Sequence, residues 1–374
     1  MVKSGGEKGW YYFNLVVLVL LAGFRYRVGG DTLIYMSMFE EYPLLDELKY
    51  FDFETAQYNP LWYVINAISR SIYDDFFVFQ FIHAIILNSI FFGFFRKYCP
   101  KFYFSAILLY YVAYYCYFNM EVLRESLGVS ILLLATPFLL QKRWVPYYLL
   151  ALVALAVHYS GLLLFLLPFL HFFKKPSWKL EILLLGIAFV CLSVINLPTL
   201  LLNLFGVNEQ LVAVIEHYTE EQRNLTGMIV ELMGYFPIFC CIWLRERNQI
   251  TEKYDFTFLI MGTVVIYALA MQIGAFSRFV NYFAPFIVVY MVNTIYHVLY
   301  LNLRKYQVSY LALLMCLVVY GFNVSYYYLR DMSEYYPNTR YGAIFLPYYT
   351  IFDKKIDNNR ENFIENYREV QILF

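Results

Sequence analysis

Long apolar runs with few or no charged residues recur along the chain and predict membrane-spanning helices. A bilayer core needs about 20 apolar residues of helix. Runs near or above this length lie at residues 10–24, 76–95, 102–118, 126–140, 144–173, 182–208, 227–244, 256–277, 279–303 and 306–329. Their apolar positions are continuous rather than alternating, which favours helices over the strands of a barrel.

Short basic loops set the predicted orientation, because Lys and Arg concentrate on the cytoplasmic side of membrane proteins. Such loops lie at residues 96–101, 141–143, 174–179, 245–247 and 304–305, and two lysines precede the first run. All of them share one side under two conditions. Pro60–Ile72, a shorter run interrupted by polar residues, must re-enter or lie at the interface, and residues 145–173 must form a hairpin that turns near His158.

The alternative to the hairpin is a single long helix. As one helix, residues 145–173 would be about 43 Å long, and as two helices about 21 Å each, whereas the core is about 30 Å thick. A single span would place the later basic loops outside, so we prefer the hairpin. The sequence then predicts an all-α polytopic integral membrane protein with about 11 transmembrane helices and a re-entrant or interfacial outer segment. Residues 1–329 form one transmembrane domain with outer loops at 25–75 and 205–226, and residues 330–374 form an extracytoplasmic tail.

Composition supports a membrane protein and narrows its chemistry. Hydrophobic residues make up 61% and charged residues 15% of the chain, against about 45–50% and 25% in soluble domains. The 28 Lys and Arg balance the 28 Asp and Glu, so net charge gives no reason to expect nucleic acid as a partner. The six cysteines lack a CxxC spacing and are interpreted as buried small hydrophobes. No nucleotide or metal motif is present, so we expect neither a cofactor nor a metal.

Arginines stand at the outward ends of several predicted spans, where positive charge is unusual. Arg25 and Arg27 follow the first run, Arg124 opens an uncharged helix, and Arg278 is the only Lys, Arg, Asp or Glu in residues 256–303. A guanidinium grips phosphate bidentately and stabilises a diphosphate leaving group as its bond to a sugar breaks. These arginines therefore predict a site for a polyprenyl pyrophosphate that carries a sugar. The alternative is a set of interfacial arginines that snorkel to headgroups.

Other polar residues on the predicted outward side also have a structural interpretation beside the functional one. Glu121 is at i−3 from Arg124, so the two share a helix face and would form either part of a site or a local ion pair. Asp31 either orients an arginine or caps the next helix. His158 is either a buried structural histidine or a functional one, acting as a base toward an acceptor hydroxyl or bonding a phosphate. Tyrosines around 110–117 and 326–328 fit interfacial belts, with sugar stacking as the alternative.

Three stretches, in this order, resemble motifs of the EpsG-like branch of the Wzy-type bacterial polysaccharide polymerases. They read GFRYRVGGDTLIY at residues 23–35, MEVLRESLG at 120–128 and LAVHYSGL at 155–162. RFVNY at 278–282 and FLPY at 345–348 also fit. The chain departs from the family pattern at Glu125, where Gln is usual, and at Gly128 and Gly161, where Ala is common.

The resemblance implies a multi-pass protein of the bacterial cytoplasmic membrane, with a fold related to the GT-C glycosyltransferases and a cavity on the periplasmic side. It implies a polymerase-type glycosyltransferase that joins undecaprenyl-pyrophosphate-linked oligosaccharide repeat units of a capsule, O-antigen or exopolysaccharide, with a chain-length regulator as a candidate partner. It favours His158, Arg124 and Arg278 as catalytic residues. As residues that bind the diphosphate or sugar it favours Arg25, Arg27, Asp31, Glu121 and Tyr282.

Two other functions fit parts of the pattern. A GT-C transferase that adds one sugar from a polyprenyl-phosphate donor usually carries an acidic pair in its first outer loop, and Asp31 with Glu40 and Glu41 would offer one. A lipid-linked oligosaccharide flippase or another transporter predicts charges deep in several spans and an internal repeat. The sequence shows no repeat, and Glu231 is the one charge we place at depth.

Overall fold

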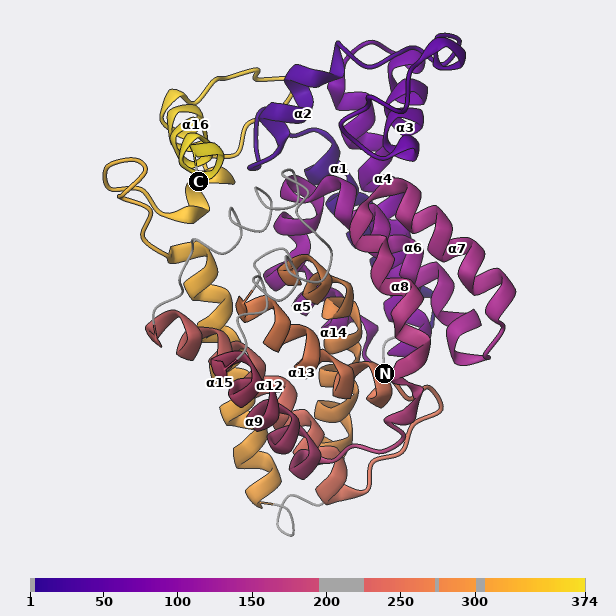
Figure 1. Ribbon diagram of the computed structural model, residues 1–374, viewed down its shortest axis with the longest axis vertical. Helices are drawn as coiled ribbons and strands as arrows, with labels where there is room; N and C mark the ends of the chain where they lie inside the picture. The colour runs from indigo at the N-terminus through magenta and orange to yellow at the C-terminus, as the bar shows by residue number, and fades with distance from the viewer. Residues whose placement is uncertain (1–3, 195–224, 273–275, 301–306, 374) are drawn as a thin grey trace. The chain divides into compact units, whose positions relative to one another are not determined.

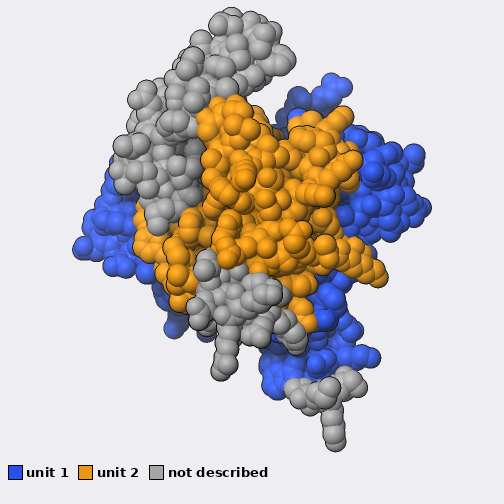
Figure 2. Space-filling model, turned by 90° about the horizontal axis from the view of Figure 1, so that it is seen from below, with its two compact units in different colours: residues 1–165, 327–370 blue, residues 166–326, 371–374 orange. Residues whose placement is uncertain are grey.

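The computed structural model describes residues 4–194, 225–272, 276–300 and 307–373, and every structural statement below concerns these residues (Figure 1). Helices account for most of them and no strand is formed among them, which confirms the all-α prediction. Most of the predicted outer loop at 205–226 lies outside the described residues. The described chain divides into two compact units, which Figure 2 distinguishes by colour.

Unit 1 comprises residues 1–165 and 327–370. Its helices are α1 (Ser4–Gly23), α2 (Thr32–Phe39), α3 (Pro60–Ile72), α4 (Phe76–Tyr98), α5 (Tyr103–Tyr110), α6 (Leu123–Leu140), α7 (Trp144–Val157), most of α8 (Leu163–Leu166) and most of α16 (Asn358–Leu373). Two π-helical turns, Tyr111–Tyr115 and Tyr117–Glu121, continue α5. The predicted runs in this unit are therefore helical, including the short Pro60–Ile72, and the run at 144–173 is divided into several helical segments.

Unit 2 comprises residues 166–326 and 371–374. Its helices are α9 (Trp178–Val194), α12 (Leu225–Asn248), α13 (Thr257–Gln272), α14 (Ser277–Tyr300) and most of α15 (Gln307–Leu329). Helix α13 packs against α9 and α14. Arg245, at the end of α12, is buried and forms an ion pair with Glu252 at 2.8 Å while its guanidinium lies 3.8 Å from the ring of Tyr290.

Three described helices are long and apolar enough to cross a membrane, namely Phe76–Tyr98, Leu123–Leu140 and Ser277–Leu299. Four shorter apolar helices accompany them, at Trp144–Val157, Tyr159–Phe172, Thr257–Tyr267 and Leu314–Leu329. These helices support a membrane protein. The count of eleven spans and the GT-C relation stay predictions.

The chain folds back at His158, as the charge pattern predicts. Helix α7 ends there, and the hydroxyl of Tyr147 near its start donates to the carbonyl of Leu164 at 2.6 Å. In one continuous helix these residues would lie about 25 Å apart. The turn is tight, because a Cβ on Gly161 would lie 2.5 Å from the backbone of Ala154. The predicted hairpin is therefore confirmed as a reversal of the chain.

Aromatic side chains from α2, α3 and α4 form the outer part of the core of unit 1. Trp62 is fully buried, and its indole N–H donates to the hydroxyl of Tyr42 at 3.0 Å. The same cluster includes Leu123 at the start of α6 and Val157 at the end of α7. A buried side chain of this size stabilises the fold by about 2–3 kcal/mol. The cluster thus fixes the ends of α6 and α7 against the first outer segment.

The C-terminal tail belongs to unit 1 and packs on the loop that follows α1. Backbone N–H groups join the two segments at Tyr26 to Tyr349 (2.9 Å) and Gly29 to Ile344 (3.0 Å). The guanidinium of Arg360, only 3% exposed, donates to three backbone carbonyls: Ala343 at 3.1 Å, Arg27 at 3.0 Å, and Pro347. Because a buried donor or carbonyl left without a partner costs about 1–3 kcal/mol, this side chain adds to the backbone hydrogen bonds that hold the tail in place.

Candidate functional site

Three segments of the chain meet at one end of unit 1. We call residues 23–35, 120–128 and 155–162 the first, second and third motif segments. Gly29 has φ of +106°, and a Cβ there would lie 1.9 Å from the carbonyl oxygen of Met120, so only glycine fits. Thr32 donates to the same carbonyl at 3.1 Å. The first and second motif segments are therefore in direct contact.

A break in the helix separates Glu121 from Arg124. The π-helical turn Tyr117–Glu121 ends at Val122, whose φ and ψ of −94° and 58° are not helical, and α6 begins at Leu123. The prediction that Glu121 and Arg124 share one helix face is therefore wrong. No ion pair joins these two described residues. π-helical turns are rare and recur at functional sites.

Tyrosines, rather than a carboxylate, surround Arg124. Its Nε donates to the hydroxyl of Tyr35 at 3.0 Å, and its guanidinium lies 4.0 Å from the ring centre of Tyr58. Such a cation–π contact contributes roughly 0.5–2 kcal/mol. Among the described residues no carboxylate is within ion-pair distance of Arg124. Within the described part of the chain its charge is thus held in position without a paired carboxylate.

Asp31 is linked to Arg124 through Tyr35. It occupies the N-cap position of α2, but its side chain makes no capping hydrogen bond. The hydroxyl of Tyr35 lies 3.5 Å from Oδ2 of Asp31, at the outer limit of a hydrogen bond. Of the two alternatives for Asp31, the geometry favours the one in which it helps to orient an arginine.

Glu121 is held by two tyrosines from the far end of the chain. Tyr327 donates to its Oε2 at 3.1 Å and Tyr341 donates to its Oε1. The guanidinium of Arg330 lies 3.7 Å from the ring centre of Tyr341 and 5.5 Å from that of Tyr327. A second cation, presented on aromatic rings, therefore stands beside the carboxylate of Glu121.

His158 is fully buried at the turn of the third motif segment. The backbone N–H of Ser160 donates to its Nδ1 at 3.2 Å, and the Ser160 hydroxyl lies 2.5 Å from the same nitrogen. Because a backbone N–H can only donate, Nδ1 acts as the acceptor and the neutral ring carries its proton on Nε2. His158 is thereby prepared to donate a hydrogen bond from Nε2, which suits a phosphate or hydroxyl oxygen better than proton abstraction.

Arg124 and His158 belong to the same end of one helical hairpin. Helices α6 and α7 pack together and are joined by residues 141–143, so the start of α6 and the end of α7 coincide. Asn59, next to Tyr58, donates to the carbonyl of Leu155 at 2.9 Å and ties the third motif segment to the aromatic partner of Arg124.

Arg25 is fully buried directly after α1. Its guanidinium donates to the carbonyls of Ala22 and, at 3.2 Å, Val28, while Nη2 has no hydrogen-bond partner among the described residues. Burial lowers the pKa of Arg25 to about 10, so the group stays cationic at neutral pH. Arg25 shares no contacting side chain with Arg124 among the described residues.

Arg27 faces the tail instead of Arg124. It adopts φ of +53° and forms a two-fold contact with Glu361, with Nη2 2.9 Å from Oε2 and Nε bonded to Oε1. This bidentate pair neutralises the charge that a phosphate would need. In this structure the residue joins the first motif segment to α16.

Arg278 and Tyr282 lie in the first turns of α14, in unit 2. Tyr282 is fully buried and Arg278 is partly exposed. The geometry given above is that of unit 1, so the role predicted for Arg278 rests on its place in the sequence and on the resemblance, and that of Tyr282 on the resemblance alone.

Several residues of this site escape prediction from sequence. Tyr35, Tyr58, Tyr327, Tyr341 and Arg330 hold or flank the charged groups. Tyr327 sits within the tyrosine cluster interpreted as an interfacial belt, where its specific contact to Glu121 leaves no trace in composition. Tyr35 could have been predicted as a site residue from the sequence, because it is the last residue of the first motif segment. No group of three or more His, Cys, Asp or Glu that would suit a metal ion occurs in the described part of the chain.

Comparison with known proteins identifies the family of the chain. The family model described as "EpsG family" matches residues 9–341, which include all three motif segments and the tyrosines that hold Glu121. No curated protein and no solved structure matches the chain. Because the match covers most of the sequence, the chain belongs to the EpsG family, whose members are EpsG-like polysaccharide polymerases.

Proposed function

We propose that this protein is a polymerase-type glycosyltransferase that joins lipid-diphosphate-linked oligosaccharide repeat units at the outer face of the bacterial cytoplasmic membrane. The observation that supports it most is Arg124, a cation held by Tyr35 and Tyr58 without a carboxylate partner among the described residues. A buried or half-buried cation of this kind is matched to an anionic ligand. Undecaprenyl pyrophosphate carrying an oligosaccharide is the substrate that family membership suggests.

In the proposed reaction an acceptor hydroxyl oxygen attacks the anomeric carbon of the donor sugar. The bond from that carbon to the diphosphate oxygen breaks, and the diphosphate leaves with the electron pair. Arg124 stabilises the charge that develops on it. His158 donates from Nε2 to a phosphate or hydroxyl oxygen, and Asp31, which shares Tyr35 with Arg124, receives the hydroxyl proton.

The single-sugar GT-C alternative is less well supported. Asp31 precedes α2 and Glu40 follows it, so the eight residues of the helix separate them by about 12 Å. Glu40 and Glu41 are also exposed. These carboxylates do not form the compact acidic pair that this alternative needs.

The transporter alternative would require several charged groups deep in the bundle. Among the side chains of unit 2 that the structure describes, Glu181 is a buried acid, and it accepts a hydrogen bond from Tyr235; the side chain of Glu231 lies outside that description. Glu181 lies in the first turn of α9, near the end of the helix rather than at its middle. We therefore keep the polymerase as the proposed function.

The test is the length of the polysaccharide made in a strain whose polymer depends on this chain. Arg124→Ala should replace the ladder of long products by a single lipid-linked repeat unit. Arg143→Ala removes an exposed arginine that lies 5.4 Å from the ring of Phe138, outside the site, and should leave the ladder intact. An unchanged ladder in a well-expressed Arg124→Ala strain would refute the proposal, and a product extended by one sugar would favour the single-sugar transferase.

A further inference from the structure

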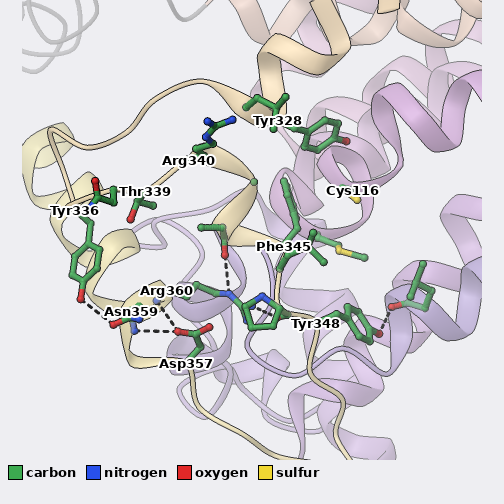
Figure 3. Close-up of a pocket in the computed structure, with 18 of the residues that line it drawn as sticks. Cys116, Tyr328, Tyr336, Thr339, Arg340, Phe345, Tyr348, Asp357, Asn359 and Arg360 are labelled. Atoms are coloured by element: carbon green, nitrogen blue, oxygen red, sulfur yellow. Dashed lines mark hydrogen bonds between the residues drawn. The ribbon is translucent and has the colours of Figure 1, made fainter.

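A cavity of about 980 Å³ lies in unit 1 between the ends of the helices and the C-terminal tail (Figure 3). Its size is at the upper end of the range for small-molecule pockets, about 300–1,000 Å³. It is lined by the end of α1, the π-helical segment after α5, the end of α15, tail residues 336–348 and the start of α16. None of the residues assigned above to the reaction lines it.

One wall of the cavity is apolar and comes from predicted membrane spans. Leu21, Val112 and Leu329 end or continue such spans, and Phe345 and Leu346 add apolar surface from the tail. Val112 is 44% and Leu346 is 67% exposed. Apolar surface of this kind at the end of a span fits a hydrocarbon chain better than a free sugar.

The opposite wall is polar, and several of its groups are already bonded within the wall. Arg360 is bonded to three backbone carbonyls, Asp357 accepts N–H groups at the start of α16, and Asn359 accepts the hydroxyl of Tyr336 at 2.9 Å (Figure 3). These groups build the wall and leave little for recognition of a ligand. Arg340 also lines the cavity, but its side chain is exposed and its charge is screened by solvent, so selectivity for an anion needs a cation that is out of water.

A buried cation lies behind this cavity. Arg25 does not line the cavity itself, but its guanidinium donates to the carbonyl of Ala22, and the carbonyl of the preceding Leu21 accepts the hydroxyl of Tyr348 at 2.5 Å; Leu21 and Tyr348 both line the cavity. No carboxylate pairs with Arg25 in the described chain, and its Nη2 has no hydrogen-bond partner there. A buried charge without a counter-charge is expensive. An anion in the cavity would meet that charge through a region of low dielectric, where attraction is strong over several ångströms.

We propose that this cavity binds the phosphate-bearing end of a second prenyl-type lipid. Arg25 supplies the counter-charge, and the apolar ends of the spans contact the hydrocarbon chain. Polymerisation joins two lipid-linked chains, so two carriers must be bound at once. The Arg124 site holds the carrier that leaves, and the cavity holds the carrier that stays. This assignment to the second carrier rests on the proposed function, but the lipid site itself does not.

Photo-crosslinking of the full chain in lipid nanodiscs tests the site without any need for turnover. The probe is a photoreactive prenyl phosphate, competed by unlabelled prenyl phosphate, by the neutral prenyl alcohol, or by inorganic phosphate. Val112→Trp fills the cavity, and Leu108→Trp places the same side chain one turn earlier at a position that is 60% exposed and does not line it. We expect labelling of cavity residues to fall about tenfold or more in Val112→Trp and to persist in Leu108→Trp.

Arg25→Gln keeps a polar side chain that can donate hydrogen bonds, although a shorter one, and removes the charge. With wild-type protein, the prenyl phosphate should compete about tenfold better than the prenyl alcohol. With the Arg25→Gln variant, the two should compete equally well. Equal labelling of Val112→Trp and wild type would overturn the site. Equal competition by the alcohol and the phosphate in wild type would overturn the role of Arg25, and competition by inorganic phosphate alone would show an anion site without a lipid.

The Arg124→Ala protein separates this proposal from the previous one. The prenyl phosphate probe should still crosslink to the cavity of this variant, although the strain that carries it no longer makes long polymer. Retained crosslinking together with an unchanged ladder would refute the polymerase mechanism and leave the lipid site standing. Lost crosslinking at the cavity in Arg124→Ala would contradict two independent carrier sites.

Discussion

The hydroxyl of Tyr35 lies 3.0 Å from Nε of Arg124 and so connects the first motif segment to the second across 89 residues of sequence. Tyr35 is only 3% exposed and belongs to the aromatic core. The charged group of the site is therefore positioned by the core itself.

Tyr35→Phe should impair polymerisation while it preserves the fold. The substitution retains the ring and removes one hydrogen bond to a charged group, worth about 1.5–3 kcal/mol. We expect long product to fall roughly tenfold or more, measured as the ladder of chain lengths per amount of protein. Tyr50→Phe, at a ring that is 81% exposed, is the matched control. Equal ladders for the two variants would show that Arg124 does not depend on this bond.

Tyr58 tests the aromatic contact separately. Tyr58→Phe keeps a ring under the guanidinium of Arg124, whereas Tyr58→Leu removes it. A loss of roughly 0.5–2 kcal/mol of cation–π attraction predicts a several-fold smaller yield of polymer for Tyr58→Leu and a near-normal yield for Tyr58→Phe. If both variants lost activity to the same extent, the hydroxyl rather than the ring would be the important group.

Two substitutions of His158 distinguish a hydrogen-bond donor from a general base. Asparagine can replace Nδ1 as the acceptor for Ser160 but lacks a group at Nε2, while glutamine can place an amide N–H near the position of Nε2. If His158 donates from Nε2, His158→Gln should retain more polymer than His158→Asn. Abolition of polymer in both variants, with normal expression, would instead favour proton abstraction by the ring.

Arg360 should control the stability of the tail. Arg360→Leu leaves three carbonyls without their donor, at about 1–3 kcal/mol for each one that stays buried. We expect residues 327–370 to become sensitive to limited proteolysis in detergent or nanodiscs, with a lower unfolding temperature. Arg340→Leu, at an exposed arginine on the same tail, should cleave like wild type. If both variants resisted proteolysis equally well, the Arg27–Glu361 ion pair and the backbone hydrogen bonds would be sufficient to hold the tail in place.

Local patterns in the sequence predict local features of this fold. The helix at Pro60–Ile72 follows directly from its apolar run, with Pro60 at the first turn where a missing N–H costs nothing. The reversal at His158 follows from the charge of loops on either side. Both depend on residues that are near one another in the chain.

Contacts across the whole chain were beyond such arguments. Arg27 and Arg360 are 333 residues apart, and neither lies in a periodic pattern that would pair them. The hydrogen bonds that Tyr327 and Tyr341 donate to Glu121 also join residues that are far apart in the sequence. The resemblance placed Arg25, Arg27 and Arg124 in one site, whereas the described contacts give each a different set of partners. Only a folded chain reveals which arginine is neutralised and which is not.

The order of synthesis gives the docked tail a further consequence. Unit 1 contains α1, yet it is completed by residues 327–370, which are made after most of unit 2. During insertion into the membrane, the carboxylate of Glu121 and the loop around Gly29 must wait for their partners while unit 2 is translated. The contacts that hold Glu121 and Gly29 therefore become complete only after most of unit 2 has been made.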